Sequence, residues 1–274
     1  MNILDCLIYG LISGFAEFIP ISSQAHQNIL RSVSGSSISP LQDLLINVAL
    51  LVAILIGCWS MLKRLHRETR KAKSRRIYNA RNADARSLCE LRLVKTSAIP
   101  MVVGMIVLIF ILPATISLPA ISILLIVNGA VLYVTDHLRH GNKDARSISR
   151  LDSILIGCCG AFSVFPGISR VGFCSCAAIA RGADKQHALN WSLLLSIPGI
   201  IIMIGKNLLD LFSSGAIALD FMSVIYCLLG AVLAFSSAYA CILLMRFFTA
   251  KIGHSGFAYY CWGLALFTFI LYLI

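Results

Sequence analysis

An uncharged run of 40 residues decides the fold: from Thr96 to Thr135 the chain reads TSAIPMVVGMIVLIFILPATISLPAISILLIVNGAVLYVT. A helix of about 20 residues crosses the roughly 30 Å hydrocarbon core of a bilayer. The run is therefore long enough for two crossings. Pro113 and Pro119 mark the boundary between them, because proline interrupts a helix. We predict two membrane-spanning helices that are joined by a tight turn.

Four further uncharged runs are long enough to span a membrane, namely Leu44–Leu62, Ala188–Gly205, Phe221–Met245 and Ser255–Ile274. The composition agrees with six spans, since 58% of the 274 residues are hydrophobic and only 13% are charged. A soluble domain carries about 25% charged residues, so this chain has too few charges to cover the surface of a soluble enzyme. The predicted class is an all-α polytopic protein that forms one domain over residues 1–274 within a lipid bilayer.

The basic residues are concentrated in one segment. Residues 63–95 hold 12 Lys and Arg and 3 Asp and Glu, which accounts for +9 of the net charge of +11. Such a block can bind nucleic acid or anionic lipid, or it can be a cytoplasmic loop that obeys the positive-inside rule. The apolar runs on both sides favour a cytoplasmic loop that touches anionic lipid, and we expect no nucleic-acid partner. With the basic loop 136–152 on the same side, both termini are predicted to lie outside.

Two shorter apolar regions, residues 1–30 and 153–180, are interrupted by polar residues, Gly and Pro. The sidedness requires the second region to enter and leave on the cytoplasmic side. The first is most simply a hairpin that enters from outside, with a full span over 1–20 as the alternative. Around Pro20 and Pro166 the two regions read GFAEFIPISS and GAFSVFPGIS. Broken segments that enter from opposite faces are typical of inverted repeats, whose site forms where they meet. We predict two re-entrant hairpins in repeats of about 1–135 and 153–274.

With Asp5 expected near the surface, the ionisable residues inside the membrane in these two regions are few: Glu17, His26 and Arg170. Such residues are costly inside a membrane and usually mark a functional site. Arg binds phosphate oxygens bidentately, and a Ser such as Ser22 or Ser23 can act as a nucleophile beside a base such as His26. A carboxylate can hold a divalent ion against phosphates or act as a base. Together these groups suit a phosphoryl substrate with an apolar tail.

Each of these residues also has a purely structural interpretation. A serine after a proline can cap a helix, as Ser22 and Ser23 could. His26 can serve as a structural hydrogen-bonding group. Arg170 and Glu17 can form a buried ion pair that only holds the two repeats together.

Two motifs contain these residues. They are EFIPISSQAH at residues 17–26 and PGISRVG at residues 166–172. With them the chain resembles the undecaprenyl-diphosphate phosphatase family, the BacA/UppP type linked to bacitracin resistance. The resemblance implies a multi-pass protein of the bacterial plasma (inner) membrane with six spans, two re-entrant hairpins and interlocked inverted repeats. It also implies hydrolysis of undecaprenyl diphosphate to undecaprenyl phosphate and inorganic phosphate, which recycles the lipid carrier for peptidoglycan synthesis.

The resemblance assigns roles to single residues and leaves open whether Ser or His is the nucleophile. The implied catalytic residues are Glu17, Ser23, His26 and Arg170. The implied substrate-binding residues are Ser22, Gly167, Ser169 and Arg170. Glu17 is the implied metal ligand, for Mg²⁺ or Ca²⁺.

Several positions depart from the family pattern. Ser13 stands where the family carries a second acid, four residues before Glu17, so we expect weaker metal binding. Gln24 and Ala25 replace the usual Thr-Gly, Gly160 replaces a common Gln, and Val171 replaces the second Ser of the later motif. A transporter that flips polyprenyl phosphate or another anionic lipid is therefore kept as the alternative. A protein without a ligand is disfavoured by the intramembrane charges. The lipid chain length and the oligomeric state stay open.

Overall fold

A computed structural model of the chain describes residues 2–35, 38–75, 85–112, 115–138, 141–145, 147–213, 221–248 and 253–273. The described residues form α-helices and one short 3-10 turn, η1, with no strand among them. The elements are α1 (Ile3–Glu17), α2 (Ser23–Ser34), α3 (Pro40–Gly57), α4 (Trp59–Arg75), α5 (Ala85–Ile111), α6 (Leu118–Asp136), α7 (Arg150–Ala161), η1 (Phe162–Val164), α8 (Arg170–Ala180), α9 (Lys185–Ser213), α10 (Phe221–Phe248) and α11 (Ser255–Leu273).

Six of these helices, α3, α5, α6, α9, α10 and α11, are long and apolar enough to cross a membrane. The predicted all-α polytopic class and the six predicted spans are therefore confirmed. The first span is shifted relative to the prediction: α3 begins at Pro40, where the Ser39 side chain caps the helix, and ends at Gly57. Pro119 lies in the first turn of α6, where the missing N–H costs nothing, and Pro113 lies outside the described residues.

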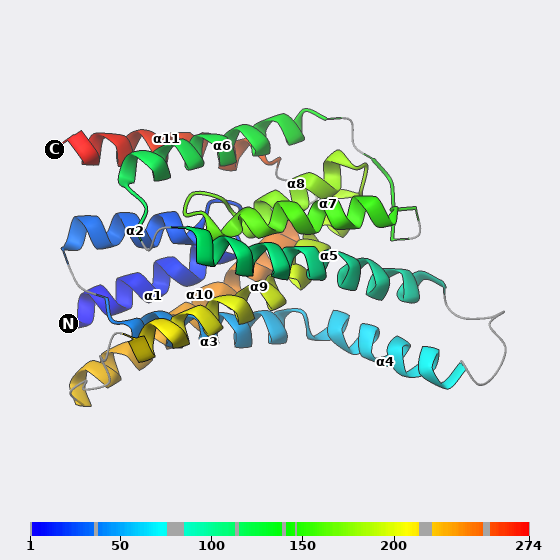
Figure 1. Cartoon of the computed structure of the whole chain (residues 1–274), viewed down its shortest axis with the longest axis horizontal. Helices are drawn as coiled ribbons and strands as arrows, with labels where there is room; N and C mark the ends of the chain where they lie inside the picture. Colours follow the sequence, from blue (N-terminus) through cyan, green and yellow to red (C-terminus); the bar gives the residue numbers. More distant parts are fainter. Residues whose placement is uncertain are drawn as a thin grey trace.

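The two interrupted regions form helical hairpins. In Figure 1 the hairpin α1–α2 points inward from the end of the bundle that holds both termini, and α7–α8 points inward from the opposite end. Helix α1 has 15 residues, about 22 Å of helix at 1.5 Å per residue, which is short of the ~30 Å needed for a span. The hairpin is thus favoured over the full span for residues 1–30. Its re-entrant placement in a membrane stays a prediction.

Each hairpin packs against a long helix of the other half of the chain. Helix α1 contacts α10, and α7 contacts α5. Both contacts need a glycine: a Cβ on Gly10 would lie 2.0 Å from the carbonyl oxygen of Gly230, and a Cβ on Gly157 would lie 2.1 Å from that of Ser97. Small residues let helix backbones approach this closely in membranes. Each hairpin thus packs on a helix of the other half of the chain, as interlocked repeats would. The repeats of about 1–135 and 153–274 stay a prediction.

The basic segment lies at the end of the bundle away from the termini. Helix α4 and the start of α5 extend there in Figure 1, together with the start of α7. The described residues of the predicted loop 63–95 are helical, since they belong to α4 and α5. Residues 76–84 lie outside the described part of the chain. Both termini lie at the other end, as the prediction of a shared side requires, and the side of the membrane stays a prediction.

Candidate functional site

Helices α2 and α8 begin next to each other at the hairpin tips. Ser22 caps α2, and its Oγ also accepts a hydrogen bond from the backbone N–H of Gly167, at 2.9 Å. Ser169 caps α8, and its Oγ donates to the carbonyl oxygen of Ile19, at 3.3 Å. Each cap thus reaches across to the turn of the other hairpin. Ser22 has a positive φ of 67°, a conformation that costs energy for a non-glycine residue and that these contacts hold in place.

Asn128 on α6 joins the same two turns. Its Nδ2 donates to the carbonyl oxygen of Pro20 and its Oδ1 accepts from the backbone N–H of Ser169, both at 3.0 Å. The side chain is fully buried, and buried backbone groups need such partners. One amide therefore fixes how the hairpin tips meet.

Glu17 stands at the centre of the polar groups at the tips. Its Oε2 accepts a short hydrogen bond from Ser23 Oγ, and its Oε1 accepts from Arg170 Nη1 at 3.1 Å. Arg170 Nε also donates to Ser163 Oγ, at 3.2 Å. Only 5% of the Arg170 side chain and 12% of the Glu17 side chain are exposed. The fold thus brings together three of the four predicted catalytic residues, from motifs about 150 positions apart in the sequence.

These groups line a small cavity. Its walls are Glu17, Ser22, Ser23, Gln24, Ser163, Ile168, Ser169 and Arg170. The first residues of α2 and α8 are both in this wall, so two helix N-termini with their partial positive charge face the same space. Helix N-termini and a guanidinium favour an anion such as a phosphoryl group. Gly167 contributes through its N–H to Ser22, not through the wall itself.

His26 lies apart from this cluster. Its Nδ1 is 2.8 Å from the carbonyl oxygen of Ser22, and its Nε2 is 2.8 Å from Tyr260 Oη, on α11. The histidine and tyrosine rings are also stacked, with centroids 5.7 Å apart. Since both ring nitrogens have these partners, the proton acceptor next to Ser23 is Glu17. The predicted pairing of Ser23 with His26 is not present in this geometry.

The donor set does not suit a resident metal ion. Both oxygens of Glu17 accept hydrogen bonds, one of them from a cation. Ser13, at the position of the missing acid, is fully buried, where its Oγ donates to the carbonyl oxygen of Tyr9 and accepts from Gln27 Nε2. Among the described residues no group of three or more His, Cys, Asp or Glu could hold an ion. The Mg²⁺ or Ca²⁺ ion expected at Glu17 stays a prediction.

The sequence did not single out Ser163, Asn128 and Gly199 as site residues. Asn128 is the one amide in the apolar run 96–135, and this isolation is the signal that could have found it. Gly199 packs on the arginine, because a Cβ there would lie 2.7 Å from Arg170 Nε. The sequence gives no signal for Gly199, since its role comes from the packing of α9 on α8.

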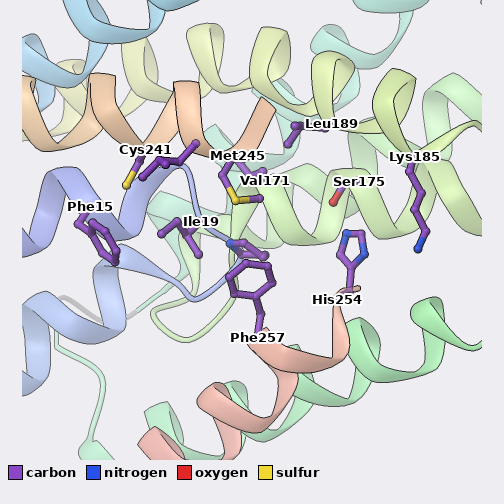
Figure 2. Close-up of a pocket in the computed structure, with 12 residues that line it drawn as sticks. Phe15, Ile19, Val171, Ser175, Lys185, Leu189, Cys241, Met245, His254 and Phe257 are labelled. Carbon is purple, nitrogen blue, oxygen red and sulfur yellow. The ribbon is translucent and has the colours of Figure 1, made fainter. Parts of the chain in front are cut away.

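An apolar pocket lies beside the cluster. It is lined by Phe15, Ile19, Pro20, Val171, Ser175, Lys185, Leu189, Cys241, Leu244, Met245, His254 and Phe257. Figure 2 shows Phe15 at one end of this pocket and Lys185 and His254 at the other. Val171 follows Arg170 in α8, and Ile19 and Pro20 lie in the turn between Glu17 and Ser22, so the pocket and the polar cavity are built on the same two hairpin tips.

Comparison with known proteins gives one family. A model described as "Bacitracin resistance protein BacA" matches residues 6–267. An undecaprenyl-diphosphatase of Halothermothrix orenii is 27% identical over 273 residues, which cover 99% of this chain and 98% of the relative. An undecaprenyl-diphosphatase of Methanobrevibacter smithii is 28% identical and covers 98% of both chains. Undecaprenyl-diphosphatase 3 of Bacillus cereus is 28% identical over 97% of this chain and 96% of the relative.

Proposed function

The chain belongs to the BacA family of bacitracin resistance proteins, and we propose that it hydrolyses undecaprenyl diphosphate to undecaprenyl phosphate and inorganic phosphate. One observation carries the proposal: a serine hydroxyl and an arginine meet on one buried carboxylate where two helices begin. The relatives above are named for this activity, and this chain aligns with nearly their whole length. Their names favour hydrolysis over the transporter alternative.

The terminal phosphate of the substrate binds at the cavity of the hairpin tips, which now measures about 10 Å³, room for about one water molecule, and which must widen as Arg170 turns toward the phosphate. Arg170 holds two of its oxygens, because a guanidinium matches phosphate geometry with two parallel N–H groups. The N-termini of α2 and α8 add backbone N–H donors. To bind in this way, Arg170 exchanges part of its contact with Glu17 for the phosphate, which leaves that carboxylate free to act as a base.

Ser23 is the nucleophile in this proposal. Its Oγ attacks the terminal phosphorus, and Glu17 Oε2 takes the hydroxyl proton. The bond from that phosphorus to the bridging oxygen breaks, and undecaprenyl phosphate leaves with the electron pair. Glu17 then passes this proton to solvent. Water attacks the phosphoserine and gives a proton to Glu17, the bond from phosphorus to Ser23 Oγ breaks, and Glu17 passes the proton to that leaving oxygen, which releases inorganic phosphate and free Ser23. His26 acts as a positioning residue, since it holds the carbonyl of Ser22 that precedes the nucleophile.

The apolar pocket receives the isoprenoid units next to the diphosphate. Its lining is almost entirely hydrocarbon, and each buried CH₂ contributes about 0.8 kcal/mol. We place the protein in the bacterial plasma membrane with both termini outside, because the basic segments at the other end of the bundle favour the cytoplasm.

Phosphate release from a polyprenyl diphosphate in detergent tests the proposal. Wild type, Arg170→Ala and His26→Ala are run side by side, with added Mg²⁺ or Ca²⁺ and with EDTA. Arg64→Gln is the matched control, because it also breaks an ion pair, with Glu90, but at the basic end of the bundle. We expect release by wild type and the control, none by Arg170→Ala and a reduced rate with His26→Ala. No release by folded wild type would refute the proposal.

A further inference from the structure

One face of α2 is polar along its length. Gln24, Gln27, Asn28 and Arg31 follow each other at the spacing of a single helix face. All four line a second cavity, of about 300 Å³. Gln24 also lines the cavity that contains Glu17 and Arg170. The polar face of α2 therefore leads directly out of the proposed reaction site.

Two basic side chains line the part of this second cavity that is farther from Glu17. Arg31 comes from α2, and Lys206 comes from α9 across the cavity. Other polar side chains in the same wall are Asp43, Asn47, Asn207 and Asp210. Both cations lie toward the end of the bundle that holds the termini, since Arg31 is near the end of α2 and Lys206 near the end of α9.

Both cations have hydrogen-bond donors left over. Arg31 uses Nη2 for Asp43 Oδ2 and for Tyr9 Oη, each at 2.5 Å. Its Nε is buried and has no hydrogen-bond partner among the residues that the structure describes. A guanidinium has five N–H groups, so the two on Nη1 stay available to a ligand and the one on Nε becomes available only if the side chain turns. Lys206 Nζ donates to Asp210 Oδ2 at 2.6 Å and has two further N–H groups.

The balance of charge suits a ligand that must leave again. Two carboxylates, Asp43 and Asp210, neutralise the two cations. An arriving phosphate is thus attracted by the free N–H donors and repelled by carboxylates behind them. The amides between this place and Glu17 carry no charge, so nothing along the way holds the anion firmly.

We propose that Arg31 and Lys206 form a second phosphate-binding site, where inorganic phosphate pauses after it leaves the reaction cavity. The assignment rests on the proposed hydrolysis, which makes phosphate at Glu17, Ser23 and Arg170. A lipid phosphate headgroup has the same chemistry, so the experiment must separate the two sources.

Product inhibition tests the site. Hydrolysis of a polyprenyl diphosphate is measured with increasing orthophosphate for wild type, Arg31→Gln and Lys206→Gln. Each protein is compared with its own uninhibited rate. A hydrogen bond to a charged group contributes about 1.5–3 kcal/mol, so we expect about a tenfold rise in the half-inhibiting concentration for Arg31→Gln. Arg64→Gln, which breaks a comparable ion pair outside this cavity, should leave that concentration unchanged.

A second arm uses polyprenyl phosphate as the inhibitor. Weaker inhibition by orthophosphate with unchanged inhibition by polyprenyl phosphate supports a site for free phosphate. Weaker inhibition by both supports the site and extends it to the lipid headgroup. Unchanged inhibition by orthophosphate in both variants overturns the proposal. Arg31→Lys keeps a positive charge opposite Asp43 and toward the cavity. It should therefore recover at least half of the inhibition by orthophosphate that Arg31→Gln loses.

A binding measurement separates this proposal from the hydrolysis itself. ³¹P NMR line broadening of orthophosphate is recorded with substrate-free wild type and with Arg31→Gln. Broadening by wild type that is reduced in Arg31→Gln, where the reaction cavity with Arg170 is still present, supports the site even where no hydrolysis is detected. Equal broadening by both proteins refutes it.

Discussion

Replacement of Arg170 by lysine separates the charge of this residue from its shape. The guanidinium makes two hydrogen bonds in different directions, Nη1 to Glu17 Oε1 at 3.1 Å and Nε to Ser163 Oγ at 3.2 Å. A lysine ammonium ends in one nitrogen and cannot present two parallel N–H groups to a phosphate. Arg170→Lys therefore keeps a cation beside Glu17 but loses the bidentate grip on the substrate.

The expected size of the effect follows from these contacts. Loss of one donor that acts on the transition state costs about 10²–10³ in kcat, so we expect kcat/KM to fall at least 100-fold in Arg170→Lys. Its thermal stability should stay close to wild type, because the Glu17 carboxylate keeps a positive partner. Arg170→Gln removes that partner. Breaking a buried ion pair costs about 3–5 kcal/mol, so this variant should lose stability as well as activity.

Two assays on the same detergent preparations decide the matter. Initial rates of phosphate release from polyprenyl diphosphate give kcat/KM, and thermal unfolding followed by circular dichroism gives Tm. The expected result is a loss of rate in both variants and a loss of Tm only in Arg170→Gln. An Arg170→Lys protein with kcat/KM within threefold of wild type would refute the reasoning, since charge alone would then suffice.

Three further predictions concern groups around the site. Gly199→Ala places a methyl group against Arg170, so we expect kcat/KM to fall at least tenfold in the release assay; a wild-type value would show that the guanidinium can move freely. Asn128→Leu leaves the buried N–H of Ser169 without a partner, at roughly 1–3 kcal/mol, and leaves the carbonyl oxygen of Pro20 with only a weak hydrogen bond from Cys261 Sγ at 3.9 Å, so it should lower Tm. Ser122→Ala on the same helix, where the hydroxyl bonds only its own helix, should leave Tm unchanged. Equal Tm values for the two variants would contradict the role of Asn128 in holding the hairpin tips together. Met245→Trp fills part of the apolar pocket and should raise KM for short and long polyprenyl diphosphates alike, because all of them carry the isoprenoid units next to the diphosphate, and an unchanged KM would refute the tail assignment.

The sequence predicted the spans well because their signal is composition over about 20 residues. The hairpins were predicted from sidedness and from the matching segments around Pro20 and Pro166, and the helices α1–α2 and α7–α8 lie there. The limits of α3 were displaced, because the cap at Ser39 acts over single residues and not over a window. Residues 76–84 of the basic segment lie outside the described part of the chain.

The sequence identified residues that meet in the candidate site, but it did not predict the hydrogen bonds between them. Rarity of charge inside apolar segments identified Glu17 and Arg170, and their contact is present. The partner of Ser23 could not be predicted, because His26 is one helical turn away in sequence and Glu17 lies before the turn. The contacts of His26 with the carbonyl oxygen of Ser22 and with Tyr260 on a distant helix hold the imidazole away from the cluster.

The most direct test of the central claim is to trap the phosphorylated protein. Wild type and Ser23→Ala are mixed with undecaprenyl diphosphate labelled in its terminal phosphate, quenched within one turnover in acid and in base, and mapped by mass spectrometry. The account predicts acid-stable label on Ser23 of wild type and none on the variant. Base-stable, acid-labile label on His26, or full turnover by Ser23→Ala, would contradict it.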